Sequence, residues 1–262
     1  TMLAVASGGS GAVIINSTTG ALVSNLVNNS NGSIQGSIYS IAWSKDQSRV
    51  FVHNGTSAIT WFTTNNWSQE RLIPNFPIFW GSSWMGGIDT TPDDSLVIFS
   101  AISEINAYWI NNGTFAWKID NHTEYIRALK VSPDGRYLAS GSDSNNMLIH
   151  TLGTTPVLIK TLNIGSDVYE IDISKDGGTV FVASRSRTVK TFDSLSWNSL
   201  GNISGFNGSS NNNRGTESIA VSPDGERLVI SHRRGNMSLY FAPDAYIRLH
   251  GEHYTSLMED YW

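Results

Sequence analysis

The stretch VSPDGRYLASGSDSNNMLIHTL, residues 131–152, decides the fold of this chain. Its apolar residues alternate with small and polar residues around a Ser-Pro-Asp-Gly turn, which is typical of two β-strands joined in a hairpin. Proline fixes φ at the second turn position, aspartate bonds its own backbone, and glycine takes the left-handed conformation that follows. A polar segment and another alternating run come next, so we expect at least three antiparallel strands.

The same turn occurs five times in the 262 residues, at intervals of 47, 41, 42 and 48 residues. The aspartates of these turns are Asp46, Asp93, Asp134, Asp176 and Asp224. Strand repeats of about 40 to 50 residues are typical of a β-propeller. Because six such repeats account for the whole length, the sequence predicts an all-β, six-bladed β-propeller of four-stranded antiparallel blades. Seven blades with part of the chain missing is the alternative.

Two of the turns lack the glycine, with Gln47 and Asp94 in its place. Aspartate tolerates a positive φ better than glutamine does, so we expect the turn at Gln47 to be the least regular. No segment shows a sustained helical period, which predicts almost no helix.

The two ends of the chain predict how the ring closes. Residues 5–8 (VASG) align with residues 138–141 (LASG), the second strand of a repeat, so the chain begins inside a blade. We expect residues 1–253 to form the propeller. Residues 254–262 would form a tail that closes the first blade or contacts a neighbouring subunit. Asp260 lies where the other innermost strands are apolar, and an unpaired blade edge is a template for strand addition.

Two stretches resemble known propeller families. Residues 131–152 resemble one repeat of the WD-repeat propellers, and residues 171–193 (IDISKDGGTVFVASRSRTVKTFD) resemble the YVTN-type repeats of microbial surface-layer propellers. WD-repeat proteins usually place Gly-His before the innermost strand and Trp-Asp at the end of the third strand. Neither pair occurs in these repeats, and residues 108–109 and 191–193 come nearest to Trp-Asp. The WD-repeat resemblance implies an intracellular scaffold.

Composition narrows the classes of partner. The net charge is -5, the pI is near 5.6, and 15% of the residues are charged. An acidic, weakly charged surface excludes nucleic acid as the main partner. The chain has no cysteine, which excludes disulfides and thiolate chemistry. The longest apolar run, residues 96–102, is too short to span a bilayer and predicts a strand.

Asparagine, serine, threonine and glycine replace charge in the expected loops. Ten sites read Asn-x-Ser/Thr, about twice the number expected by chance, which predicts N-linked glycans and an extracellular or cell-surface location. The asparagines are Asn16, Asn28, Asn31, Asn54, Asn66, Asn112, Asn121, Asn202, Asn207 and Asn236. Turn chemistry is the alternative explanation, because four of these sites are Asn-Gly, a strong hairpin signal.

The sequence offers no catalytic constellation. The turn aspartates are explained by turn geometry and lie apart around the ring. His53 and His232 end their strands without an adjacent acid, and we expect them to line one rim as hydrogen-bonded turn residues. We therefore predict no enzyme, no catalytic residue, no metal and no cofactor other than glycans. A hydrolase or lectin with a metal or sugar in the channel is the alternative.

Aromatic residues outside the strand alternation are candidates for an interface, or else fill gaps between blades. They are Phe76, Phe79, Trp80 and Trp84 in the longest connection, and Tyr261 and Trp262 in the tail. The sequence predicts a secreted or surface-exposed structural and interaction module rather than an enzyme. Its partners would be other copies of itself or surface proteins. The more specific form of this prediction is self-assembly into a fibre or layer.

Overall fold

The computed structural model describes residues 2–7, 11–26, 38–54, 58–73, 86–186, 188–203, 216–223, 225, 227–232 and 237–241. These residues form strands and turns and no helix. The strands make six antiparallel sheets, in each of which the strands follow one another in chain order. Within the described residues there is no seventh sheet, which confirms the six-bladed prediction.

The sheets are named A to F in chain order. Sheet A contains β1 (Met2–Ser7), β2 (Gly11–Asn16) and β3 (Leu22–Leu26). Sheet B contains β4 (Ile38–Trp43), β5 (Arg49–Asn54), β6 (Ala58–Thr63) and β7 (Gln69–Ile73). Sheet C contains β8 (Ile88–Thr90), β9 (Leu96–Ala101), β10 (Glu104–Trp109) and β11 (Phe115–Ile119). Sheet D contains β12 (Ile126–Val131), β13 (Tyr137–Ser142), β14 (Asn146–Thr151) and β15 (Leu158–Asn163). Sheet E contains β16 (Val168–Ile173), β17 (Thr179–Ser184), β18 (Val189–Asp193) and β19 (Ser199–Ile203). Sheet F contains β20 (Thr216–Val221), β21 (Arg227–His232) and β22 (Met237–Phe241).

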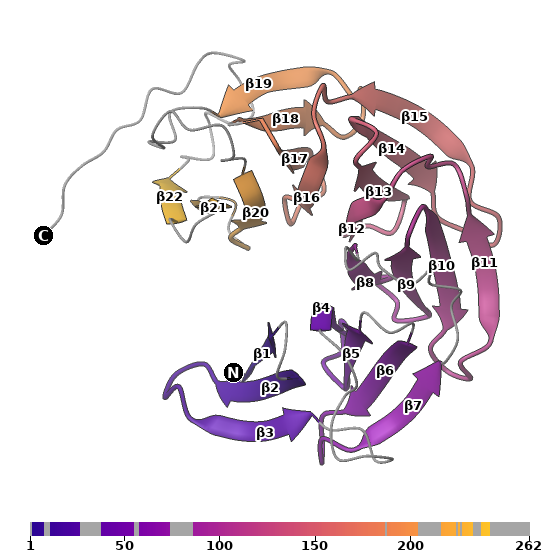
Figure 1. Ribbon diagram of the computed structural model, residues 1–262, viewed down its shortest axis with the longest axis vertical. Coiled ribbons are helices and arrows are strands. Elements are labelled where there is room, and N and C mark those ends of the chain that lie inside the picture. The colour runs from indigo at the N-terminus through magenta and orange to yellow at the C-terminus, as the bar shows by residue number, and fades with distance from the viewer. Residues whose placement is uncertain are drawn as a thin grey trace, which may run out of the picture.

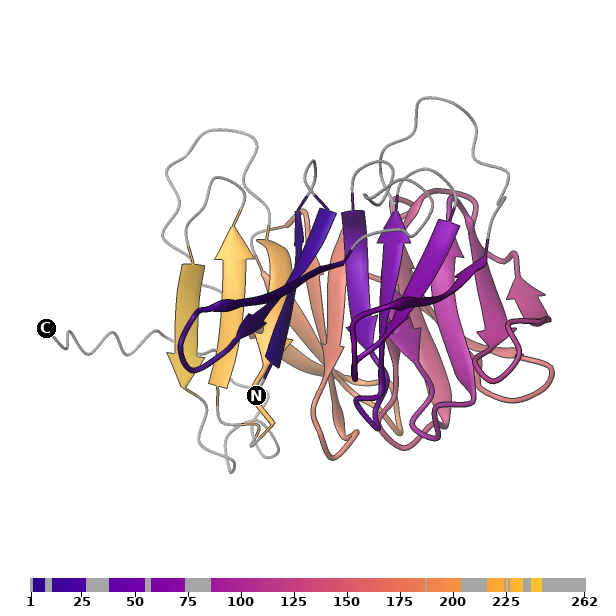
Figure 2. The same ribbon diagram turned by 90° about the horizontal axis from the view of Figure 1, so that it is seen from below.

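The sheets stand side by side around a common centre (Figures 1 and 2). Strands β4, β8, β12, β16 and β20 lie innermost, and β3, β7, β11, β15 and β19 lie at the periphery (Figure 1). Sheets B to E have the predicted four strands, whereas three are described in A and in F. The predicted role of residues 254–262 lies outside the described residues and stays a prediction.

The five predicted turns share one geometry. In each, the fourth residue has a positive φ and donates its N–H to the carbonyl of the first, as Gly135 does to Ser132 over 2.9 Å. Gln47 has a φ of 61° and donates to Ser44 over 3.0 Å. The expectation of an irregular turn there was therefore wrong. The neighbouring strands fix the turn, at the cost of a left-handed non-glycine residue.

Strand pairing corrects the predicted register at the N-terminus. Met2 pairs with Asn16, which begins the hairpin between β2 and β3. In sheet D the residue paired in this way is Tyr137, opposite Thr151. Leu3 therefore corresponds to Leu138, so the predicted alignment of residues 5–8 with 138–141 was wrong by two residues. The short apolar motif fits both registers, and the hairpin decides between them.

The core lies between the sheets. Five hydrophobic clusters of described residues join A to B, B to C, C to D, D to E and E to F. Each cluster combines the forward face of one sheet, which points to the next sheet in the chain, with the rear face of that next sheet. Between B and C, for example, Ile59 and Trp61 of β6 pack with Val97 and Phe99 of β9.

Candidate interaction site

The turns contact one another around one end of the ring. Asp94 accepts hydrogen bonds from the backbone N–H groups of Lys45 (2.7 Å) and Asp46 (2.8 Å) in the preceding turn. A Cβ placed on Gly135 would lie 3.4 Å from Pro92. In sheet C, where the preceding turn offers two N–H groups, Asp94 occupies the left-handed position, and in sheets D and E, where the preceding turn holds a proline, a glycine does. The turns therefore help to hold neighbouring sheets together.

Two carboxylates on innermost strands each connect three consecutive sheets. Asp89 of β8 pairs with Lys45 Nζ of sheet B (2.9 Å) and accepts the N–H of Val131 in sheet D (3.1 Å). Asp172 of β16 pairs with Lys130 Nζ of sheet D (3.0 Å) and accepts the N–H of Val221 in sheet F (2.8 Å). Both carboxylates are largely buried, so their backbone hydrogen bonds matter more than the partly exposed ion pairs.

The sequence analysis missed these charges. They lie two residues before the first turn residue, where the five repeats have Ala42, Asp89, Lys130, Asp172 and Ala220. The sequence did contain a signal for these contacts, because charges of alternating sign occupy this position in three consecutive repeats. Burial favours the neutral amine of Lys130, but the carboxylates of Asp172 and Asp89 raise its pKa above the ordinary value. The lysine is therefore charged at neutral pH.

Glu170 lies near this group on β16. Its carboxylate is 3.5 Å from Ser218 Oγ of sheet F. Burial raises the pKa of Glu170 to about 7, Lys130 opposes this rise, and Asp172 adds to it. Glu170 can therefore hold or release a proton near neutral pH, although the described contacts place no reacting group beside it.

A buried polar cluster lies against sheet D. The two ring nitrogens of His122 bond Ser140 Oγ (2.8 Å) and Ser142 Oγ (3.0 Å). His150 donates from Nε2 to Asn121 Oδ1 over 2.9 Å. Burial lowers the pKa of both histidines to about 4, with His150 also lowering that of His122. Both rings are neutral at pH 7 and fix the segment before β12 onto sheet D.

His53 does not lie in a rim turn as expected. It is fully buried on β5 with its ring 5.6 Å from that of Phe99 in sheet C. Burial lowers the pKa of His53 to about 4. The ring packs between sheets because residue 53 belongs to the paired part of the strand, opposite Ile59. The side chain of His232 lies outside the described residues.

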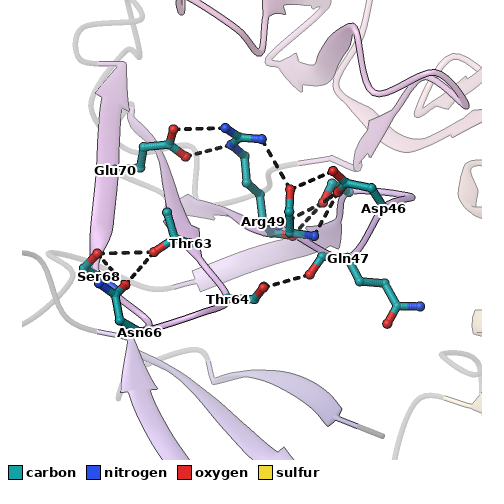
Figure 3. Close-up of polar contacts among 10 residues, drawn as sticks. Asp46, Gln47, Arg49, Thr63, Thr64, Asn66, Ser68 and Glu70 are labelled. Carbon is teal, nitrogen blue, oxygen red and sulfur yellow. Dashed lines mark hydrogen bonds and ion pairs between the residues drawn. The ribbon is translucent and has the colours of Figure 1, made fainter.

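Two candidate glycosylation sites, Asn66 and Asn112, occupy equivalent hairpins. Asn66 Oδ1 accepts from Thr63 Oγ1 (2.6 Å), Ser68 N (3.0 Å) and Ser68 Oγ (2.7 Å), as Figure 3 shows. Asn112 Oδ1 accepts from Thr114 N (2.9 Å) and Thr114 Oγ1 (2.7 Å). The Asn-x-Ser/Thr pattern is therefore also the pattern of an Asx turn in these hairpins. Turn chemistry accounts for their sequence whether or not a glycan is present.

The other candidate asparagines are in different settings. Asn202 is exposed on β19, Asn16 is half-buried at the end of β2, and Asn121 is exposed and bonded to His150. The backbone of Asn54 ends β5, and its side chain lies outside the described part of the chain. Also outside the described residues are Asn28, Asn31, Asn207 and Asn236.

None of the aromatic interface candidates lies within the described residues. This applies to Phe76, Phe79, Trp80, Trp84, Tyr261 and Trp262, and also to the turn residue Asp224. Two other tryptophans, Trp67 and Trp197, hold left-handed hairpin positions with φ of 57° and 59°. Trp67 packs edge-on against Trp43, and Trp197 against Tyr137 of the preceding sheet. These two tryptophans fill gaps at the joints between blades.

The described residues contain no group of three or more His, Asp or Glu side chains placed to hold a metal ion. They also contain no helix that is long and apolar enough to cross a membrane.

Comparison with known proteins gives two matches. The family described as "WD domain, G-beta repeat" matches residues 113–150. These residues run from the hairpin after β10 to the end of β14, and they include the His122 cluster. The chain is a WD-repeat-like β-propeller. Mouse (Mus musculus) WD repeat-containing protein 62 is 41% identical to this propeller over 63 residues, which cover 24% of this chain and 4% of the mouse protein.

The matched repeat of this WD-repeat-like propeller contains part of a family signature. Asn121-His122 precedes β12, where the family usually places Gly-His, and His122 bonds Ser140 of the second strand. The Gly-His pair itself is absent, as expected, and His122 stands in the place of its histidine. His150 and Thr151 end the third strand in place of Trp-Asp.

Proposed function

We propose that this propeller is a protein-interaction module that acts outside the cell, carries N-linked glycans, and associates with copies of itself or with surface proteins. Its WD-repeat-like architecture supports an interaction or scaffold role, because the sheets form a rigid frame around one axis. The low proportion of charged residues supports an environment in which neutral polar groups and sugars keep the surface soluble.

The observation that carries the extracellular proposal is the exposure of three candidate asparagines on outer hairpins and strands. Asn66, Asn112 and Asn202 are exposed. Within the described residues, the side-chain hydrogen bonds of Asn66 and Asn112 use Oδ1, so Nδ2, the atom that would bear the sugar, is left for a glycan.

The test is intact mass spectrometry of the protein from its native source, before and after an N-glycosidase. We expect glycoforms spaced by the mass of a hexose before treatment, and after it the loss of one whole glycan from each occupied site, with that asparagine converted to aspartate. Asn112→Asp gives a matched variant, because aspartate keeps the Oδ1 acceptor of the turn and removes the glycosylation site. Asp93 already forms such a turn in sheet C, accepting from Ser95 N over 3.1 Å and from Ser95 Oγ over 2.8 Å. Asn198→Gln, at an exposed asparagine outside any site, is the control.

An intracellular scaffold is the second candidate function. It is favoured by the match to mouse WD repeat-containing protein 62 and by the Asx turns, which explain Asn66 and Asn112 without sugar. A native mass that the glycosidase does not change would select this function and reject the extracellular one.

The hydrolase or lectin alternative has its own test. Metal analysis of the purified protein and a glycan-binding screen should give no stoichiometric metal and no saturable sugar binding if the protein is an interaction module. Saturable binding of one sugar class would contradict the proposed function.

A further inference from the structure

Sheet F packs against a neighbouring sheet on one side. Its rear face packs on sheet E in a hydrophobic cluster, whereas no cluster of described residues joins its forward face to sheet A. On that forward face, Met237 is 75% exposed and Leu239 is 53% exposed. By strand pairing they are equivalent to Ile59 and Trp61 of sheet B, which are fully buried. Within the described part of the chain, sheet F is therefore attached through its contacts with sheet E.

Sheet A has an uncovered rear face, on which Leu3 is 49% exposed and Val5 is 38% exposed. Their equivalents in sheet C, Val97 and Phe99, are fully buried. We call the rear face of A and the forward face of F the free faces. The two sheets lie at the two ends of the arc in Figure 1. Sheet F can therefore separate from sheet E without breaking a second hydrophobic cluster among the described residues.

Two carboxylates on β16 contact the innermost strand of sheet F. Asp172 accepts the N–H of Val221 on β20 over 2.8 Å. The carboxylate of Glu170 lies 3.5 Å from Ser218 Oγ on the same strand. Residues 170 and 172 are two positions apart on one strand, so their side chains lie on the same side of it. The attachment of β20 therefore includes two acidic groups side by side.

The cation that faces both carboxylates is Lys130 of β12. It pairs with Asp172 over 3.0 Å and also favours the charged form of Glu170, whereas Asp172 disfavours that form because like charges repel. From β20 the polar group is Ser218, and the side chain of Glu217 lies outside the described residues. Strands β13 and β17, which also pack on β16, contain no charged residue. One ammonium group thus balances two carboxylates.

This arrangement makes ionisation of Glu170 costly while sheet F is in place. Burial and the neighbouring Asp172 raise the pKa of Glu170 to about 7, against the opposing effect of Lys130. When sheet F moves away, water reaches the carboxylate and its pKa falls towards the ordinary 4.5. Sheet F is therefore held most firmly below pH 4.5, and this contribution is lost as pH rises through 7.

We propose that Glu170 is a pH-sensitive attachment of sheet F to sheet E. With Glu170 protonated, sheet F stays packed on sheet E. Loss of the proton lets sheet F separate more readily and uncovers the cluster in which Phe181 and Ala183 of sheet E pack with Ile219 of sheet F. The inference goes beyond the proposed function and does not depend on glycans or on self-association.

The first test asks whether sheet F opens by itself. The chain has no cysteine, so a single thiol can be placed in one buried cluster. Ala183→Cys places it between sheets E and F, and Ala139→Cys, the matched control, between sheets D and E; both alanines are fully buried. We expect a thiol reagent at pH 8 to label Ala183→Cys roughly tenfold faster or more, because local opening costs less than global unfolding. Equal rates would overturn the proposal.

The second test measures the pH dependence with Glu170→Gln, which keeps an oxygen acceptor for Ser218 and cannot ionise. The labelling rate of Ala183→Cys is divided by that of Ala183→Cys with Glu170→Gln, which cancels the titration of the thiol. We expect this ratio to rise about tenfold from pH 5 to pH 8. Glu104→Gln is the control, because Glu104 pairs with Lys118 within sheet C over 2.8 Å; its ratio should stay constant. A constant ratio for Glu170→Gln would reject the proposal.

A third measurement needs no substitution in the cluster between sheets E and F. Carbon-13 NMR follows the glutamate side-chain carboxyl groups of the unsubstituted chain, and the signal that is missing from Glu170→Gln identifies Glu170. A titration midpoint near 7 supports the attachment. A midpoint near 4.5 would show that sheet F does not oppose ionisation, and it would overturn the proposal even if the cysteine variants fold poorly.

Discussion

The interface between sheets B and C and the free faces of sheets A and F carry the same kinds of side chain in opposite surroundings. At the B–C interface, Ile59, Trp61, Val97 and Phe99 are fully buried against one another. At the free faces, their equivalents Met237, Leu239, Leu3 and Val5 are exposed. A repeat thus fixes which face of a strand is apolar, while burial depends on the presence of a neighbouring sheet.

The largest effect expected from this comparison is between two methionines at equivalent positions. Met147→Ala should lower the free energy of unfolding by about 3 kcal/mol, because it leaves a cavity between sheets D and E. Met237→Ala should change it by less than about 0.5 kcal/mol, because Met237 is exposed. Urea denaturation at protein concentrations that keep copies apart measures both. Equal losses would mean that the face of sheet F is covered in the monomer.

The next effect concerns the carboxylate that joins sheets D, E and F. Asp172→Ala removes the acceptor for Val221 N–H and the partner of Lys130. We expect a loss of about 2 kcal/mol, because the buried N–H is left unpaired. Asp167→Ala, which removes a 3.4 Å ion pair to the exposed Arg185, should cost less than about 0.5 kcal/mol. If the two variants unfold at the same urea concentration, Asp172 does not hold these sheets together.

A smaller effect depends on pH. The folded pKa of Glu170, about 7, lies above its ordinary value of 4.5, so its contribution to stability is present below pH 4.5 and is lost as pH rises through 7. The free energy of unfolding of Glu170→Gln should therefore equal that of wild type at low pH and exceed it by about 1–2 kcal/mol at pH 8. This gain is smaller than the full pKa shift implies, because the side chain is partly exposed. Urea denaturation of both proteins from pH 4 to 8 measures the difference, and a constant difference would refute it.

The smallest effect expected is a gain at the turn of sheet F. Gly225 has a φ of 75°, and it follows a turn containing Lys175, whose backbone N–H is available as that of Lys45 is to Asp94. Gly225→Asp should raise the free energy of unfolding by about 0.5 kcal/mol through a hydrogen bond from Lys175 N–H, as Lys45 N–H donates to Asp94. Gly177→Asp is the control and should give no gain, because it follows Pro133 and its Cβ would lie 3.6 Å from an Asp134 oxygen. A lower thermal midpoint for Gly225→Asp would contradict the prediction.

Local sequence predicted the strands, turns and blade number, because alternation and turn residues act over a few positions. It failed where the decision involves other strands of the same sheet or another sheet. The register of β1 depends on the β2–β3 hairpin, and the turn at Gln47 is held regular by its strands. The burial of His53 depends on Phe99, 46 residues away in the chain, and the role of Asp89 on Lys45 and Val131.

The candidate sites were less predictable than the fold. The glycosylation pattern in Asn66 and Asn112 coincides with the residues that an Asx turn requires, so one sequence serves two explanations that only chemical analysis separates. His122 was hard to recognise in the sequence, because an asparagine precedes it in place of the glycine of the expected Gly-His pair. Its hydrogen bonds to Ser140 and Ser142 become visible only when the segment lies against sheet D.

By itself the sequence determined that this protein is a ring of similar antiparallel sheets, because each repeat encodes its own alternation and its own turn. The tertiary structure decided which apolar faces are covered, which charges meet across sheets, and which two faces no described sheet covers. The physical reason is that hydrogen bonding within a strand pair is local, whereas burial requires a second surface. That surface comes from residues about 40 to 50 positions away, or from another molecule.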